Sequence, residues 1–178
     1  LSGLVGSEMC IRDRRNGIWR NMGGCLAPMN AYLNIIGMET LGLRMERVCN
    51  NAFRLAQALE KLEGVSVNYP LLESSPYHEL AEKQLSGKGG AILTIRTGSK
   101  ERAYKLINHL KYVKIATNIG DVRTLVIHPA STIYIHSTPE AMEEAGVYDD
   151  TIRISVGIED IKDLIQDFTE AVESLGEE

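Results

Sequence analysis

The chain has 178 residues, a formal net charge of −5, 44% hydrophobic residues and 24% charged residues. These values are typical of a folded globular protein and exclude a disordered or fibrous chain. The acidic balance leaves no basic stripe for nucleic acid. Because the sequence has neither an apolar run of about 20 residues nor a signal-peptide pattern, we expect a cytoplasmic protein without a membrane partner.

The first 14 residues differ from everything that follows them. The stretch LVGSEMCIRDR, residues 4–14, matches a translated reading frame of a transposase sequencing adaptor. We therefore interpret residues 1–14 as non-native and leave them out of the fold prediction. The three cysteines form no C-x-x-C pair, which favours reduced structural thiols over disulfides or zinc ligands.

Helix formers dominate the next part of the chain. Residues 31–63 carry apolar side chains at helical spacing, which predicts one long helix or two helices that meet near Gly37 or Gly42. Gly64 is a suitable C-terminal stop, and VSVNYP after it is typical of a short strand. We place the boundary between a connecting segment and a compact domain at this glycine.

The connecting segment covers residues 15–63 and the compact domain residues 64–178. Short strands and helices follow one another there in an order too irregular for a βαβ repeat. This order predicts an α+β fold, a mainly antiparallel sheet with helices on one face. The other face stays available for a ligand or another domain. Strands are predicted at 91–97, 113–117, 124–128 and 151–156, and helices at 76–85, at 100–110, from 139 and at 159–175.

The last predicted strand, TIRISV, places an arginine where a neutral residue is usual. Ile152 and Ile154 point to one face and Arg153 to the other. An exposed strand arginine forms salt bridges worth about 0 to 1 kcal/mol. An arginine covered by another domain needs an anion, and its planar fork suits a carboxylate. Spacing alone favours a salt bridge to a nearby acid over a ligand site.

Other polar motifs have simple structural interpretations. TNIGD, residues 117–121, is either a tight turn or a loop that offers backbone N–H groups to an anion, and we favour the turn. His128 before Pro129 is better explained as a structural histidine than as a base. No histidine pattern has metal-ligand spacing, so no metal site is predicted. We interpret these acids as a solvated face with helix-start charge: Asp149, Asp150, Glu159, Asp160 and Asp163.

Four segments in order carry a resemblance to a known family. They are LAPMNAYLNIIGMETLGLRMERV, NYPLLESSPYHELAEKQL, NIGDVRTLVIHPAS and AGVYDDTIRISVGIEDIKDLIQDF. Together they resemble the C-terminal part of the Cys/Met-metabolism family of pyridoxal-phosphate (PLP) enzymes, over residues 15–175. Asn-x-Gly-Asp followed by LVIHPAST is most similar to the O-acetylhomoserine sulfhydrylase branch.

This resemblance implies a fold, a cofactor and site residues. The fold is the C-terminal small domain of a fold-type I PLP-dependent transferase, preceded by a long connecting helix. The parent enzyme would be a homotetramer that makes homocysteine from O-acetyl-L-homoserine and sulfide in methionine biosynthesis. Arg153 would hold the α-carboxylate of the substrate, and Asn118 would help to bind the same group, largely through its backbone. Residues 15–63 would be the end of the large PLP domain and the connecting helix, and residues 64–178 the substrate-binding domain. PLP would be bound by the missing large domain.

The departures from the family pattern are equally informative. The Schiff-base lysine lies in a Ser-x-Thr-Lys motif that does not occur here, and TGSK at 97–100 is out of place. We therefore expect a fragment that is inactive alone, with no catalytic or cofactor-binding residue of its own. Cys49 and Tyr134 stand where the branch usually has histidine.

Three alternatives stay open for the function. Two keep the family and make the parent a cystathionine γ-synthase or a methionine γ-lyase. The third is of another class, a non-catalytic α+β module that binds carboxylates or a partner protein. Binding of amino acids by the isolated chain would favour this third interpretation.

Overall fold

A computed structural model describes residues 15–23 and 26–176, so the stretch interpreted as non-native lies outside the described residues. The chain divides into two compact units, residues 1–41 and 42–178. The boundary predicted at Gly64 stays a prediction. Within the described residues, every helix is too short or too polar to cross a bilayer.

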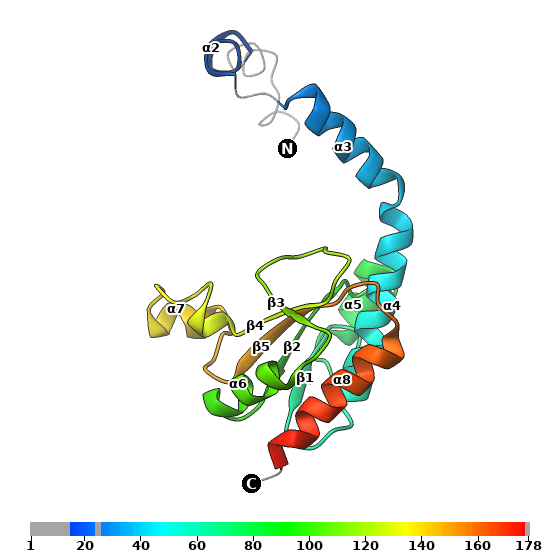
Figure 1. The fold of residues 1–178 in the computed structure, drawn as a ribbon, viewed down its shortest axis with the longest axis vertical. Helices are drawn as coiled ribbons and strands as arrows, with labels where there is room; N and C mark the ends of the chain where they lie inside the picture. The colour runs from blue at the N-terminus through cyan, green and yellow to red at the C-terminus, as the bar shows by residue number, and fades with distance from the viewer. Residues whose placement is uncertain (1–14, 24–25, 177–178) are drawn as a thin grey trace. The chain divides into compact units, whose positions relative to one another are not determined.

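The first unit is helical where it is described. A π-helical turn, η1 (Arg15–Trp19), leads into α2 (Arg20–Met22), and α3 (Pro28–Glu39) follows (Figure 1). Pro28 occupies the first turn of α3, where its missing N–H costs nothing. The next helix, α4 (Leu41–Leu59), begins after a break at Thr40. This break confirms the prediction of two helices, because it lies between Gly37 and Gly42.

The second unit contains a five-stranded sheet in the order β1-β2-β5-β4-β3. All neighbouring strands are antiparallel except β3 and β4. The α+β prediction of a mainly antiparallel sheet is therefore confirmed. The elements are β1 (Ser66–Asn68), α5 (His78–Leu85), β2 (Ile92–Arg96), α6 (Lys100–His109), β3 (Lys114–Ile115), β4 (Leu125–Ile127), α7 (Pro139–Glu144), β5 (Thr151–Ser155) and α8 (Ile161–Glu173), with 3-10 turns at Pro129–Ser131 and Ser174–Gly176.

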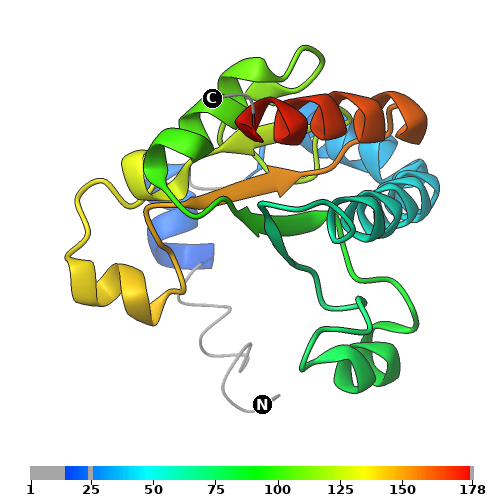
Figure 2. The same cartoon turned by 90° about the horizontal axis from the view of Figure 1, so that it is seen from below.

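The core lies between the sheet and three helices, α4, α6 and α8, which cover the same face in Figure 2. Ile152 and Ile154 of the central strand β5 point into it and are fully buried. Phe168 of α8 is also fully buried. Burial of each such side chain contributes about 1.5 to 3 kcal/mol to the free energy of unfolding. Because β5 alternates, Arg153 lies on the face away from these helices.

Helices α6 and α7 begin at the predicted residues, whereas α8 begins at Ile161, two residues later than predicted. The side chains of Ser99, Thr138 and Asp160 accept hydrogen bonds from the first turns of α6, α7 and α8. Helix α5 also begins two residues later than predicted, at His78. The Ser75 hydroxyl accepts a hydrogen bond from the Tyr77 amide in a preceding turn, so it is not available as a helix cap.

A buried tyrosine fixes the chain before β2. The Tyr69 hydroxyl donates a hydrogen bond of 2.9 Å to the carbonyl of Gly90. Burial, together with the nearby Cys49 thiol, raises the pKa of this hydroxyl, so it stays protonated and acts as a donor. A Cβ on Gly89 would lie 2.6 Å from the Tyr69 hydroxyl oxygen, so this position requires glycine.

A buried carboxylate that the sequence analysis did not single out joins α8 to the chain between α6 and β3. Asp167 is 2% exposed. Its oxygens accept hydrogen bonds from the backbone amides of Lys111 at 2.9 Å and Tyr112 at 3.1 Å. Among the described residues these amides make no other hydrogen bond, so Asp167 satisfies backbone donors that follow the end of α6.

Replacing this carboxylate tests the packing of α8. We expect Asp167→Ala to lower the free energy of unfolding by about 1 to 3 kcal/mol, because two backbone donors lose their acceptor. Asp163→Ala, one helical turn earlier and exposed, is the control and should change it by less than about 0.5 kcal/mol. Chemical denaturation followed by circular dichroism measures both values. Equal effects of the two variants would contradict this role of Asp167.

Candidate functional site

Arg153 lies at the middle of β5, the central strand of the sheet. It aligns with Thr94 on β2 and Ile127 on β4, which place it in the interior of the sheet. Its side chain is half-buried. Within the described part of the chain, its guanidinium makes no hydrogen bond and no ion pair. The prediction of a salt bridge for Arg153, which spacing alone favoured, is therefore wrong within the described residues.

A second half-buried arginine shows what a satisfied guanidinium looks like in this fold. Arg102 on α6 donates to three backbone carbonyls, those of Thr97 at 2.7 Å, Leu175 at 3.2 Å and Gly64 at 3.3 Å. Arg102 thus joins three segments: the residues before α6, those before β1 and those after α8. Among the described residues Arg153 has no such acceptors. A planar carboxylate is the group that could accept hydrogen bonds from its guanidinium.

Asn118 lies in the exposed segment between β3 and β4. Its side-chain oxygen accepts a hydrogen bond of 2.9 Å from the Ile119 amide, and its amide group lies 3.5 Å from a carboxylate oxygen of Asp121. Gly120 has a φ of +80°, which suits glycine. The chain bends at 119–120, but no backbone hydrogen bond among the described residues closes a turn over 117–121, so the tight turn stays a prediction. Among the described residues no hydrogen bond joins Asn118 to Arg153, and its part in binding stays a prediction.

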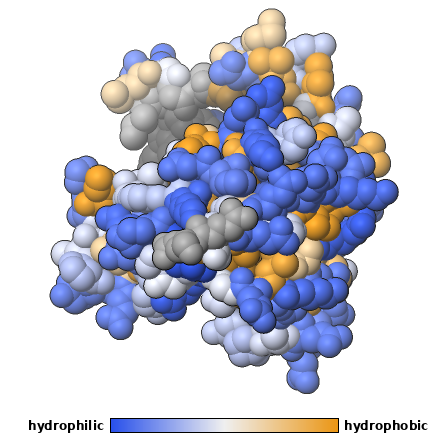
Figure 3. Space-filling view, turned by 60° about the horizontal axis from the view of Figure 1, so that its bottom comes forward, coloured by the Kyte–Doolittle hydropathy of each residue, from blue (hydrophilic) through white to orange (hydrophobic). Residues whose placement is uncertain are grey.

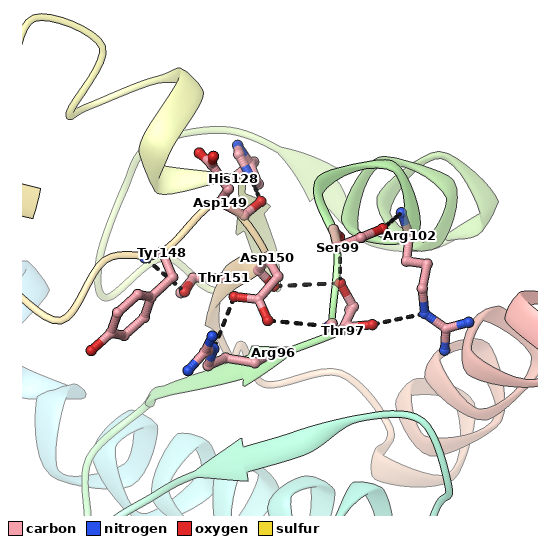
Figure 4. A network of polar contacts seen from close by, with 10 residues as sticks. Arg96, Thr97, Ser99, Arg102, His128, Tyr148, Asp149, Asp150 and Thr151 are labelled. Atoms are coloured by element: carbon pink, nitrogen blue, oxygen red, sulfur yellow. Dashed lines mark hydrogen bonds and ion pairs between the residues drawn. The ribbon is translucent and has the colours of Figure 1, made fainter. Parts of the chain in front are cut away.

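The start of β5 is tied to β2 by Asp150. Its carboxylate accepts hydrogen bonds from Arg96 Nε at 2.8 Å and from the Gly98 amide at 3.1 Å, as Figure 4 shows for the arginine. The Arg96 guanidinium also stacks over the Tyr148 ring, 4.2 Å from its centroid. The interpretation of Asp150 as a solvated acid is wrong, because folding brings it to a strand 54 residues away.

The turn after β5 holds a second acid that the sequence interpretation placed in solvent. The Glu159 carboxylate binds the amide and the hydroxyl of Thr124, the residue before β4. Helix α8 begins only at Ile161, with Asp160 as its cap. Glu159 is therefore a link between two segments, and its assignment to the first turn of α8 is wrong.

His128 has the structural role that the sequence analysis favoured. Its ring is buried, its Nδ1 accepts a hydrogen bond from the Ser131 amide at 3.2 Å, and its Nε2 lies 2.6 Å from the carbonyl of Asp149. These contacts suit a ring that accepts at Nδ1 and donates from Nε2. The ring also meets the Tyr104 ring edge to face. Both nitrogens are occupied, so His128 does not serve as a base here.

Two further features concern binding at other places. A cavity of about 300 Å³ lies between α4 and α5, and neither Arg153 nor Asn118 lines it. Within the described residues, no group of three or more metal-ligating side chains could hold a metal ion. The unpaired guanidinium of Arg153 therefore remains the site with the clearest chemistry.

Comparison with known proteins identifies the family. The profile of the Cys/Met metabolism PLP-dependent enzymes matches residues 1–173. The chain belongs to this family. The resemblance found in the four sequence segments is thereby confirmed. Members of this family use PLP, and amino acids of sulfur metabolism are their substrates.

Curated members of the family are similar to this chain over a part of their length. O-acetyl-L-homoserine sulfhydrylase 1 of Thermus thermophilus is 42% identical over 164 residues, which are 91% of this chain and 39% of that protein. Homocysteine synthase of Schizosaccharomyces pombe is 46% identical over 156 residues, 86% of this chain and 36% of that protein. An L-methionine gamma-lyase of Fusobacterium nucleatum is 38% identical over 178 residues, 98% of this chain and 45% of that protein. This chain thus spans about two fifths of the length of these relatives.

Solved structures of the family have the same fold. A Campylobacter jejuni protein assigned as an O-acetylhomoserine (thiol)-lyase, which contains N'-pyridoxyl-lysine-5'-monophosphate, superposes with a TM-score of 0.87 at 35% identity. The match covers 96% of this chain and 41% of that one. O-acetylhomoserine sulfhydrylase of Wolinella succinogenes gives a TM-score of 0.75 at 35% identity, over 91% and 43% of the two chains.

The residues present do not fit PLP itself. Every lysine of the chain is exposed, whereas a Schiff-base lysine needs an enclosed site. The sequence also contains no Ser-x-Thr-Lys segment. The guanidinium of Arg153 has the hydrogen-bonding geometry that a carboxylate requires.

The ion pair at the start of β5 provides a test of the scaffold. We expect Asp150→Ala to lower the free energy of unfolding by about 1 to 3 kcal/mol, because the Gly98 amide and Arg96 lose their acceptor. The neighbouring Asp149→Ala removes an exposed carboxylate and should cost less than about 0.5 kcal/mol. Urea unfolding of the three proteins measures the difference. An Asp150→Ala protein as stable as the parent would contradict the role of Asp150 as an anchor.

Proposed function

We propose that this chain is the substrate-binding C-terminal part of a PLP-dependent γ-replacement enzyme, one that makes homocysteine from O-acetyl-L-homoserine and sulfide. The observation that carries the proposal is the half-buried guanidinium of Arg153 without an anion among the described residues. Similarity to O-acetyl-L-homoserine sulfhydrylases supports the substrate.

Arg153 binds the α-carboxylate of the amino acid in this proposal. Two parallel N–H···O hydrogen bonds between a guanidinium and a carboxylate fix orientation as well as position. Lysine offers a single point charge and lacks this geometry. Because Arg153 lies on the central strand with paired neighbours on both sides, its backbone cannot shift to follow a misplaced substrate. Orientation of this kind favours both binding and turnover.

Asn118 contributes to the same site through its segment. Its side chain is engaged in the turn with Ile119 and Asp121. The backbone of this segment is therefore left to bind the substrate carboxylate, which is the role that the resemblance implies. Asn118 is thus a substrate-binding residue in this proposal, and neither it nor Arg153 carries out bond cleavage.

The rest of the enzyme would supply PLP and its lysine. The cofactor stabilises negative charge at the substrate carbon when it is bound. This chain spans about two fifths of its relatives and contains no Ser-x-Thr-Lys segment, so we expect the 178 residues alone to be inactive. The whole enzyme would be a cytoplasmic homotetramer.

The exposed apolar surface supports an association with further protein. Helix α3 has no buried side chain among the described residues, although most of its residues are apolar. A helix that is apolar all round is usually covered. Figure 3 shows further hydrophobic patches within a mainly hydrophilic surface. These features fit a chain whose remaining partners are the other parts of the enzyme and its other subunits.

A methionine γ-lyase is the second candidate, because the Fusobacterium nucleatum lyase matches the chain over 178 residues. The two activities have different products. A lyase releases an α-keto acid and ammonia from L-methionine, whereas the γ-replacement enzyme forms homocysteine only when sulfide is present. Cystathionine formed from cysteine would instead indicate a cystathionine γ-synthase.

Replacement of Arg153 in the full-length protein tests the site. We expect Arg153→Lys to raise KM for O-acetyl-L-homoserine about 10- to 100-fold, because two charge-assisted hydrogen bonds become one at best. Arg153→Ala should have a larger effect. The exposed Arg123→Ala is the matched control, since it removes the same charge from the segment that contains Asn118. Steady-state assays of homocysteine with PLP present give KM and kcat.

Two results would contradict the proposal. Unchanged kinetics of Arg153→Ala would show that this arginine does not bind the substrate. Absence of turnover with O-acetyl-L-homoserine, together with binding of free amino acids by the 178-residue chain alone, would favour the non-catalytic module instead.

A further inference from the structure

The turn that follows β5 binds the segment containing Asn118 through a compact set of hydrogen bonds. The Thr124 hydroxyl donates to Glu159 Oε2 at 2.8 Å and accepts from the Gly157 amide at 2.9 Å. The Thr124 amide donates to Glu159 Oε1. The Ile158 amide donates to the Val122 carbonyl at 3.0 Å. Thr124 is fully buried, so these bonds are shielded from water.

The segment between β3 and Thr124 has little other support. Its residues 116–120 and 122–123 are exposed, and Asp121 is half-buried. Their remaining hydrogen bonds are local, within the Asn118 turn, or join the segment to β4. A segment with few buried contacts takes its position from the bonds at its ends. Thr124 is the buried end of this one.

Close packing also fixes the approach of the two segments. A Cβ on Gly157 would overlap the Val122 carbonyl oxygen and lie 2.6 Å from the carbonyl carbon of Arg123. Both neighbours are backbone atoms, which cannot rotate away. Glycine at 157 therefore lets the turn and the segment approach more closely than any other residue would.

Helix α4 holds the turn from the other side. The Asn51 side-chain amide donates to the carbonyls of Gly157 at 3.0 Å and Glu159 at 2.9 Å. Arg47, one helical turn earlier, donates to the carbonyls of Ile158 and Glu159. Asn51 is fully buried, and its Oδ1 finds no partner among the described residues. An unsatisfied buried oxygen is costly, so this clamp is maintained at the expense of stability.

We propose that Glu159 and Thr124 are positioning residues, which set the Asn118 segment at a fixed distance from the Arg153 guanidinium. Arg153 and Gly157 are four residues apart on one continuous stretch of backbone. The same stretch therefore presents the guanidinium and holds the segment that faces the substrate. Neither residue touches the substrate. This inference rests on the proposed function, because it assumes that both parts meet one carboxylate.

The test uses the full-length protein with PLP and compares two changes at one position. Thr124→Val keeps the shape of the side chain but removes the hydroxyl, whereas Thr124→Ser keeps the hydroxyl. We expect Thr124→Val to raise KM for O-acetyl-L-homoserine about tenfold. KM for sulfide should stay within about twofold, because sulfide has no carboxylate. Thr124→Ser should stay within about twofold for both substrates.

A second pair of variants separates positioning from general loss of stability. Glu159→Gln keeps the size of the side chain and one acceptor, so we expect a smaller rise in KM for the amino acid than in Thr124→Val. Asp163→Asn removes a charge from the exposed first turn of α8 and should change neither KM. Melting temperatures of all variants are measured in parallel.

The outcomes distinguish this inference from the proposed function. If Thr124→Val raises both KM values equally, or neither, while Arg153→Lys raises only KM for the amino acid, the positioning role is overturned and the proposed function stands. If Arg153→Lys also leaves KM for the amino acid unchanged, the proposed function fails and the inference fails with it. If the protein acts as a lyase, L-methionine replaces both substrates in the assay. A fall in kcat of Thr124→Val for L-methionine without a rise in KM then overturns the positioning role.

Discussion

A charged side chain at the centre of a sheet is the constraint on which this structure depends. Arg153 is half-buried, and within the described residues it has no acceptor. The two neighbouring strands hold its backbone by ladder hydrogen bonds, which fixes the position from which the side chain extends. Isoleucines on either side bury the opposite face of the same strand in the core. One strand thus contributes both to the core and to the candidate site.

Acids at both ends of this strand have complementary tasks. Asp150 binds β2 before the strand begins, and Glu159 binds Thr124 after it ends. These carboxylates accept hydrogen bonds from the backbone amides of Gly98 and Thr124. Between them the strand has no freedom to slip in register, and a slip by one residue would turn Arg153 into the core. The acids therefore protect the direction in which the arginine points.

Hydrogen bonds between residues close in the sequence, such as helix caps, could be predicted. Hydrogen bonds between residues far apart in the sequence could not. The caps Ser99 and Thr138 act on amides three residues away, so a short window contains all the information. Arg153 could be singled out because it lies centrally on the second face of an alternating strand. Asp150 and Glu159 find partners 54 and 35 residues away. No spacing rule reports such a pair, and a run of acids resembles a solvated surface until the fold is known.

The turn at 157–159 has one more property, which concerns how its sequence can vary. Gly157 is confined by backbone atoms and Glu159 acts through its carboxylate, whereas Ile158 contributes only its main chain and its side chain is 38% exposed. We therefore expect substitutions to be excluded at positions 157 and 159 and tolerated at position 158. If the three codons are randomised together, active clones should keep glycine at 157 and glutamate at 159 and should accept many residues at 158. This pattern could identify the turn in unaligned environmental sequences.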